Sequence, residues 1–419
     1  MPPLPREGRS TAWIRDRLDA LAGGDVDWRS GRALSLAYSA GPEVLALTDE
    51  VLARFQSTNA LNVAAFPSLR VMQAEIVEMS GELLHLPEDG GGFVTSGGTE
   101  SILCAVKAAR GLARARGNTS PEMVLPTSAH AAFEKAAADY DVRSVRVPVR
   151  ADFRADPEAM RAALNDRTAL VVASAPAYPQ GVVDPIAEIA AAAAARGLPM
   201  HVDACMGGVT LPMLERLGHA VPPFDFRVAG VTSMSVDLHK YGYTAKGTSV
   251  ILYRSRELRR HQTFVTDNWL GGLYGSAAIL GTRSGGPIAA AWAVMQHLGI
   301  DGYLRLTEAA RRATEELVAG LRALPEIRLL AEPDTTLVAF ACDGMGSDSA
   351  IDAFAVGDAL WRRGWVCDQQ KPPPSLHCTV NAIHAGKIDA LLAALRDSLD
   401  EVRSTKSEGP GRSYAIVEG

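Results

Sequence analysis

Short apolar runs alternate with longer segments of helical pattern through the middle of the chain. Between about residues 90 and 255 the strand-like runs read GGFVTS, EMVLPT, VRSVRVPV, ALVVASA, LPMHVDA, VTSMSV and TSVILY. The segments 100–116 and 184–196 carry Ala, Leu, Ile and Val at helical spacing and are bounded by Gly or Pro, so we expect crossover helices there. This alternation predicts an α/β fold in which helices cover a large, mostly parallel sheet.

A second, smaller α/β unit is predicted where the pattern changes, near residues 310–325. A long helical segment, DGYLRLTEAARRATEELVAGLRAL, leads there to the strand-like runs IRLLAEP, TTLVAFAC and GWVCDQ and then to a final helix at 386–403. The predicted parts are an N-terminal segment (1–60), a large domain (61–315), a small C-terminal domain (316–403) and a flexible Ser- and Gly-rich tail (404–419).

The composition is that of a folded protein with room for more than one domain. The chain has 419 residues, of which 47% are hydrophobic and 21% charged. Its formal net charge of −6 argues against a protein that binds the phosphate backbone of nucleic acid. The N-terminus carries charges where a signal peptide is apolar, and the apolar runs fall short of the roughly 18 residues that span a bilayer. The five cysteines form no CxxC pair and suggest neither a zinc site nor a disulfide framework, so we expect a reducing, cytoplasmic location.

Two lysines stand close together in a chain that otherwise uses arginine. The stretch SVDLHKYGYTAKG holds Lys240 and Lys246, whereas only seven of the 42 Lys and Arg residues are lysine. Lys240 directly follows the strand-like run VTSMSV, at the expected carboxyl edge of the sheet. A lysine there can form an imine when burial and neighbouring groups lower its pKa. From the residue alone, a solvated surface lysine is the alternative.

Two further features fall at predicted strand ends. FVTSGGTES reads as a strand, a glycine-rich turn and a helix that begins near Thr99, which exposes backbone N–H groups to a phosphate. The turn matches neither GxGxxG nor the P-loop motif, so nucleotide binding is disfavoured. From the residues alone, a plain βα turn with Ser96 or Thr99 as the helix N-cap would give the same sequence pattern as a phosphate cradle. Asp203 ends the run LPMHVD, where it faces a ligand or merely caps the next helix. A phosphate cradle, a strand-end acid and a strand-end lysine are together what pyridoxal phosphate needs.

Longer stretches extend this pattern. They are FPSLRVMQAEIV, TSGGTESIL, SAHAAFEKAA, HVDACMGG, PFDFRVAGVTSMSVDLHKYGYTAKG and GGLYGSAAILGTRSGG. Through them the chain resembles the sphingosine-1-phosphate lyase branch of the group II decarboxylase-like enzymes of fold type I, which use pyridoxal phosphate. The resemblance runs from about Tyr38 to the stretch PPPSLHCTVNAIHAG, nearly the whole chain. It implies the fold type I architecture, pyridoxal 5'-phosphate as cofactor and a homodimer.

The resemblance implies a role for each residue of the cofactor site. Lys240 would be the lysine that forms the imine with the cofactor, Asp203 the acid that faces the pyridine nitrogen, and His130 the imidazole stacked on the ring. The residues that would serve the cofactor phosphate are Gly98, Thr99 and His239. From the residues alone, His130 also reads as a helix cap or a core histidine, and His239 as support for Lys240.

A second phosphate site, for the substrate, is also implied by the resemblance. Lys246 matches the family lysine that contacts the substrate phosphate, and Tyr38 and Thr282 match other residues of that pocket; a phosphate wants a point cation and hydroxyl donors. Asn62 departs from the family, whose members carry a histidine there, because an amide can donate a hydrogen bond but adds no charge. The loop 275–286 would come from the neighbouring subunit and complete the site. A loop cation is the alternative reading of Lys246.

Three readings of the function follow. As a lyase, the protein would cleave the Cα–Cβ bond of a phosphorylated β-hydroxy amine such as sphingosine 1-phosphate and release an aldehyde and phosphoethanolamine. As a decarboxylase, or in another pyridoxal phosphate reaction, it would act on a small amino acid or amine. A homologue that only binds the cofactor is the third reading. The lyase is favoured, because a simple amino-acid decarboxylase does not need a second phosphate site at Lys246, Thr282 and Tyr38.

Overall fold

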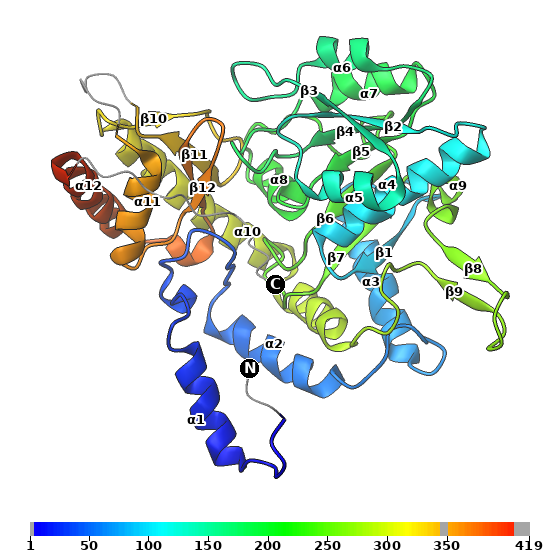
Figure 1. Ribbon diagram of the computed structural model, residues 1–419, viewed down its shortest axis with the longest axis horizontal. Coiled ribbons are helices and arrows are strands. Elements are labelled where there is room, and N and C mark those ends of the chain that lie inside the picture. The colour runs from blue at the N-terminus through cyan, green and yellow to red at the C-terminus, as the bar shows by residue number, and fades with distance from the viewer. Residues whose placement is uncertain (1–3, 344–350, 406–419) are drawn as a thin grey trace.

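The computed structural model describes residues 4–343 and 351–405. Two sheets lie on opposite sides of one long helix, and the N-terminal helices extend below them (Figure 1). Most of the tail predicted at 404–419 lies outside the described residues, and the last described helix, α12, spans Ile388–Thr405.

Seven strands form the large sheet, in the order β1-β7-β6-β5-β4-β2-β3. Their bounds are β1 Gly91–Thr95, β2 Glu122–Pro126, β3 Arg143–Val147, β4 Thr168–Ser174, β5 Met200–Asp203, β6 Ser233–Val236 and β7 Ser249–Tyr253. The strands from β3 to β6 pair in parallel, whereas β7 lies antiparallel between β6 and β1. Each strand coincides with one of the apolar runs, so the prediction of a mostly parallel sheet in an α/β fold is confirmed.

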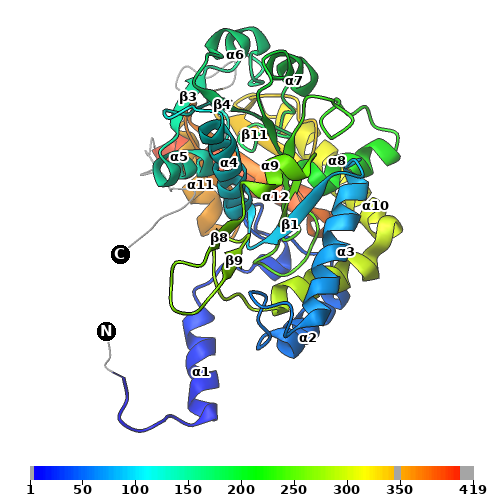
Figure 2. The same cartoon turned by 90° about the vertical axis from the view of Figure 1, so that its right-hand side faces the viewer.

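Helices bury both faces of this sheet, as the alternation along β4 shows. Leu170 and Val172 join a core cluster with residues of α4 (Gly98–Ala115) and α5 (Ala132–Tyr140). Val171 and Ala173 point the other way, into the main core with residues of α3, α7, α8 and α10. Figure 2 shows α4 and α5 on one side of the strands and α3, α8 and α10 on the other. Because both faces are covered, inner strands such as β4 and β7 are buried along their whole length, whereas the edge strand β3 is only partly buried.

The carboxyl ends of several strands meet at one edge of the sheet. β5 ends at Asp203, β6 ends one residue before Asp237, and Ser235 of β6 lies opposite Asp203 in the parallel register. β1 is antiparallel to β7, as is β6, so β1 points in the same direction as β6 and delivers the turn at Gly97 to the same edge. Open α/β sheets bind their ligands at such an edge.

A second, four-stranded sheet has the order β10-β11-β13-β12. Its strands are β10 Arg328–Leu329, β11 Leu337–Ala341, β12 Asp368–Gln370 and β13 Ser375–Thr379. The helix α10 (Gly286–Arg322) connects the two units: its first half packs in the main core, and its second half packs with the small sheet. Gly299 has a non-helical backbone (φ 54°, ψ −172°) between the two halves, and the predicted domain boundary at 315 falls inside this helix.

The remaining elements surround these two units. The other α-helices are α1 Thr11–Ala22, α2 Pro42–Phe55, α3 Pro67–Leu83, α6 Pro157–Ala163, α7 Ile186–Ala194, α8 Gly207–Arg216, α9 Arg256–Arg260 and α11 Ala353–Arg362; two 3-10 turns lie at Trp28–Ser30 and Ala382–His384. The hairpin β8–β9 (Phe264–Thr266 and Tyr274–Ser276) was not expected from the sequence. Within residues 4–343 and 351–405, every helix is too short or too polar to cross a bilayer.

Candidate active site

The glycine-rich turn opens α4 without a side-chain hydrogen bond from its N-cap residue. Gly97 is the N-cap residue, so the first backbone N–H groups of the helix have no capping side chain from that position. A Cβ at Gly98 would stand 2.7 Å from a carboxylate oxygen of Asp237 and 2.8 Å from the Cys205 sulfur. Only glycine fits this close approach of backbone and side chains, so the turn is shaped as a cradle for a small anionic group.

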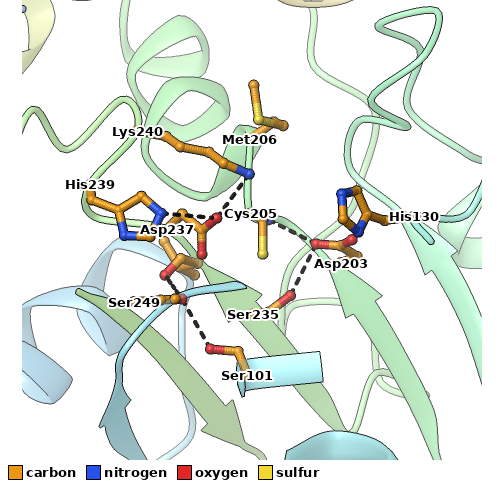
Figure 3. A network of polar contacts seen from close by, with 12 residues as sticks. Ser101, His130, Asp203, Cys205, Met206, Ser235, Asp237, His239, Lys240 and Ser249 are labelled. Atoms are coloured by element: carbon orange, nitrogen blue, oxygen red, sulfur yellow. Dashed lines mark hydrogen bonds and ion pairs between the residues drawn. The ribbon is translucent and has the colours of Figure 1, made fainter. Parts of the chain in front are cut away.

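Asp203 stands at the end of β5, buried, with its carboxylate fixed by two donors. Its Oδ1 accepts hydrogen bonds from the backbone N–H of Cys205 and from the hydroxyl of Ser235, both at 3.1 Å. His130 lies beside this carboxylate (Figure 3). The hydroxyl of Ser235 on the neighbouring strand and the backbone of the turn after β5 therefore hold the Asp203 carboxylate in one orientation.

Lys240 forms a buried ion pair that sequence reasoning missed. Its Nζ lies 2.8 Å from Oδ2 of Asp237, a residue only 2% exposed (Figure 3). Burial, the largest single effect, would lower the pKa of Lys240, but the charge of Asp237, the hydrogen bond to it and the nearby Cys205 and Tyr38 together raise that pKa well above its usual value. Burial would likewise raise the pKa of Asp237, yet Lys240 and then His239 lower it. Asp237 precedes Lys240 by three residues after the same strand, which is the signal that could have identified it.

Two histidines flank this pair, and both are kept neutral. Nδ1 of His130 accepts a hydrogen bond from the backbone N–H of Ala132 at 3.1 Å, and burial lowers its pKa although Asp203 opposes the shift. Nδ1 of His239 accepts from the N–H of Thr248 at 3.2 Å, and burial again lowers the pKa. Nε2 of His239 lies 3.7 Å from Oδ2 of Asp237. Because the usual pKa is near 6.5, a lowered value leaves both rings uncharged at neutral pH.

These residues enclose one cavity of about 350 Å³. It is lined by the glycine turn, His130, Asp203, Cys205, Met206, Tyr178, Asp237, His239 and Lys240. A volume of this order suits a small molecule, and the wall combines a phosphate cradle, an acid and an amine. The six residues expected at a cofactor, Gly98, Thr99, His130, Asp203, His239 and Lys240, all line it. The cavity therefore fits pyridoxal phosphate in both size and donor set.

Tyr38 and Lys246 come together next to this cavity. Nζ of Lys246 lies 4.9 Å from the centre of the Tyr38 ring and donates to the carbonyls of Leu36 at 2.9 Å and His239 at 3.2 Å. The Tyr38 hydroxyl contacts the Met206 sulfur at 3.9 Å, and Met206 lines the cofactor cavity. The pKa of Lys246 is lowered to about 8, mainly because the ammonium is buried and secondly because of the positive charge of Lys240.

The other two residues expected at a substrate phosphate lie elsewhere on the same chain. Oδ1 of Asn62 accepts from the N–H groups of Ala64 and Ala65 at 3.1 and 3.2 Å, and the residue is exposed. Thr282 is also exposed and accepts from the side chain of Asn59. Tyr38 and Lys246 line a second cavity, separate from the cofactor cavity, and neither Asn62 nor Thr282 lines it. One chain by itself therefore divides the expected phosphate residues into two separate groups.

Comparison with known proteins adds an independent set of findings. The sequence profile of the pyridoxal-dependent decarboxylase conserved domain matches residues 11–343. The chain is 41% identical, over 96% of its length, to a sphingosine-1-phosphate lyase of Oryza sativa subsp. japonica, of which it covers 75%. It is 39% identical, over 99% of its length, to sphingosine-1-phosphate lyase 1 of Rattus norvegicus, of which it covers 73%. The solved structure of the Burkholderia pseudomallei K96243 sphingosine-1-phosphate lyase superposes with a TM-score of 0.90 at 36% identity and covers 97% of this chain and 94% of that one.

Proposed function

The chain belongs to the pyridoxal-dependent decarboxylase family, on its sphingosine-1-phosphate lyase branch, and we propose that it cleaves the Cα–Cβ bond of a phosphorylated amino alcohol. A substrate of the sphingosine 1-phosphate kind would yield an aldehyde and phosphoethanolamine. Pyridoxal 5'-phosphate is the cofactor. The observation that carries the proposal is the position of Lys246. This second cation lies against the ring of Tyr38, whose hydroxyl contacts Met206 in the wall of the cofactor cavity.

The cofactor supplies the electron sink, and the residues of the cavity hold and orient it. The N–H groups at the start of α4, with Gly98 and Thr99, would receive its phosphate, and His239 stands beside them as a neutral imidazole. Asp203 would face the pyridine nitrogen, with its carboxylate already fixed by Ser235. His130 would lie against the ring.

Lys240 is the amine that would attach the cofactor. In the structure its Nζ is an ammonium held by Oδ2 of Asp237 at 2.8 Å, so Asp237 both places the nitrogen in the cavity and stabilises the proton that the amine must lose before it can act as a nucleophile. The carboxylate of Asp237, at 2.8 Å, would receive this proton when Lys240 bonds to the cofactor.

Lys246 and Tyr38 would hold the far end of the substrate. A phosphate there gains a point cation and a phenol, and Lys246 is already positioned by two carbonyls. A cavity of about 470 Å³ adjoins these two residues and is lined by Leu36, Val44, Leu45 and Leu52 among others, which supports a substrate with an apolar part. A neutral amino acid that loses carbon dioxide has no anionic group to place at this second cation, so this site favours a phosphorylated substrate over such an amino acid.

We propose a homodimer in which Asn62, Thr282 and the loop 275–286 of one subunit complete the phosphate site of the other. Thr282 and Asn62 are exposed and do not line their own chain's cavity at Tyr38, which supports this exchange. The hairpin beside the loop exposes Trp269, Leu270 and Leu273, with 56%, 108% and 79% of their surface accessible, apolar area that a partner subunit would cover. The free thiols of the described chain fit a cytoplasmic location, as proposed from the cysteine pattern.

A product assay separates this function from its main alternative. Purified protein is incubated with sphingosine 1-phosphate, a short-chain phosphorylated amino alcohol and a panel of amino acids, while aldehyde, phosphoethanolamine and carbon dioxide are followed together. Aldehyde and phosphoethanolamine in equal amounts support the lyase. Carbon dioxide from an amino acid, with no aldehyde from either phosphorylated substrate, would replace the lyase by a decarboxylase.

A further inference from the structure

We propose that His201, acting through Ser235, is a positioning residue that orients Asp203 toward the cofactor. This inference rests on the proposed use of Asp203 at the pyridine nitrogen. His201 lies two residues before Asp203 on β5, on the same side of the strand, and is fully buried. Its Nε2 is 3.3 Å from the hydroxyl of Ser235, and that hydroxyl lies 3.1 Å from Oδ1 of Asp203. Its Nδ1 is 3.0 Å from the hydroxyl of Ser233.

The proton count gives this chain of contacts one direction. The carboxylate of Asp203 only accepts, so the single hydroxyl proton of Ser235 points to Oδ1. Ser235 must then accept from His201, which places the imidazole proton on Nε2. Nδ1 is left without a proton and accepts from Ser233. The three bonds together require a single tautomer of His201, with every donor aimed toward Asp203.

The surroundings keep this arrangement from changing. Burial lowers the pKa of His201 to about 4, although the charge of Asp203 opposes the shift, so the ring stays neutral at physiological pH. Ser233 and Ser235 are both buried on β6, directly beside β5. Phe133 of α5 packs against the ring, with centroids 6.1 Å apart and planes at 63°. The imidazole thus bridges two parallel strands beneath the carboxylate and limits its rotation.

A structural role alone would also bury a histidine here, so the first test reads the tautomer directly. The full chain is labelled with 15N-histidine, and two-bond 15N–1H spectra are recorded with and without cofactor, using His201→Gln to assign the signal. We expect a protonated Nε2 and an unprotonated Nδ1, unchanged from pH 8 to pH 5.5. A proton on Nδ1, or a charged ring within this range, would overturn the relay.

A second test compares variants by their affinity for pyridoxal phosphate in the absence of substrate. His201→Leu and Ser235→Ala remove a donor in the line to Asp203, and each should weaken cofactor binding and shift the pH dependence of the cofactor absorbance. A lost neutral hydrogen bond corresponds to roughly two- to tenfold in affinity. His201→Gln keeps an amide donor near the Nε2 position and should recover most of the loss.

Controls make each outcome decisive. His219 is exposed, so His219→Leu should bind the cofactor like the unmodified protein. Far-UV circular dichroism and thermal midpoints check that the variants at buried positions fold. Ser233→Ala removes only the contact at Nδ1 of His201, so its cofactor affinity tests the same chain of hydrogen bonds with a smaller change to the core. Equal losses in His201→Leu and His201→Gln would show that only packing matters. Failure of the lyase itself would appear instead in the products of the unmodified protein, with the tautomer result unaffected.

Discussion

Removing the charge at Lys246 should impair turnover of phosphorylated substrates and spare others. The ammonium is already fixed by two carbonyls, at 2.9 and 3.2 Å, and by the face of Tyr38. Little reordering is therefore needed when a phosphate arrives, and the charge-assisted hydrogen bond should approach its full value of about 1.5–3 kcal/mol. Lys246→Ala and Lys246→Met should then lower kcat/KM for a phosphorylated amino alcohol by roughly one to two decades.

The assay compares the phosphorylated substrate with its unphosphorylated analogue for each variant. Lys246→Met keeps most of the apolar stem, so a loss shared by both variants reports the charge and not the packing. Lys135, on the surface in an ion pair with Asp139, gives the matched control: Lys135→Ala should behave like the unmodified protein. Cofactor absorbance should not change. Equal losses on the two substrates would remove the second phosphate site, and with it the main argument for a lyase.

The same lysine predicts a pH dependence with a definite sign. The pKa of Lys246 lies at about 8 in the structure, below its usual value, so the cation is present below pH 8 and is lost as the pH rises through that value. For the free enzyme, kcat/KM on the phosphorylated substrate should fall above about pH 8 and the Lys246→Met profile should lack this step. A step of the same size in Lys246→Met would assign it to another group.

Further outcomes are expected at four positions. Lys240→Ala should abolish turnover and the borohydride-dependent attachment of cofactor to the chain, seen by mass spectrometry, and Lys240→Arg should not restore either because a guanidinium stays protonated. Asp203→Asn should retain the cofactor but lose most turnover, whereas wild-type rates would make Asp203 only structural. Gly98→Ala should weaken cofactor binding in an equilibrium titration, because its Cβ would lie 2.7 Å from Asp237; Gly24→Ala, in open space, is the control. Asn62→His should raise kcat/KM for the phosphorylated substrate most clearly at slightly acidic pH, and no gain there would exclude this position from the phosphate site.

The strands, and the placement of Asp203 and Lys240 at one edge of the sheet, were predictable from the sequence for a physical reason. Buried parallel strands appear as uninterrupted apolar runs, and a polar residue just after such a run falls at the ligand edge of the sheet. That argument led to Asp203 and Lys240 separately, and the structure brings both into one cavity. Local pattern decides these positions, because the strand and its direction follow from the residues around them.

Other features depend on contacts that no local pattern encodes. The hydrogen bonds from His201 through Ser235 to Asp203 cross between two strands whose order is set by the whole fold. The hairpin at 264–276 has few apolar positions directed inward, so its pattern did not stand out as paired strands. The meeting of Tyr38 with Lys246, more than two hundred residues apart, was expected only through the family resemblance.

The local structure at Asn62 explains why so much should depend on one lysine. Its amide oxygen already accepts from two backbone N–H groups of its own turn, so only the NH₂ group can reach a substrate phosphate, and that group carries no charge. A histidine at this place could contribute a cation near neutral pH, and the amide cannot. Of the four residues expected at the substrate phosphate, Tyr38, Asn62, Lys246 and Thr282, Lys246 is then the one with a positive charge. On the protein side, the affinity for a phosphorylated substrate should consequently fall as Lys246 loses its proton, above a pH of about 8.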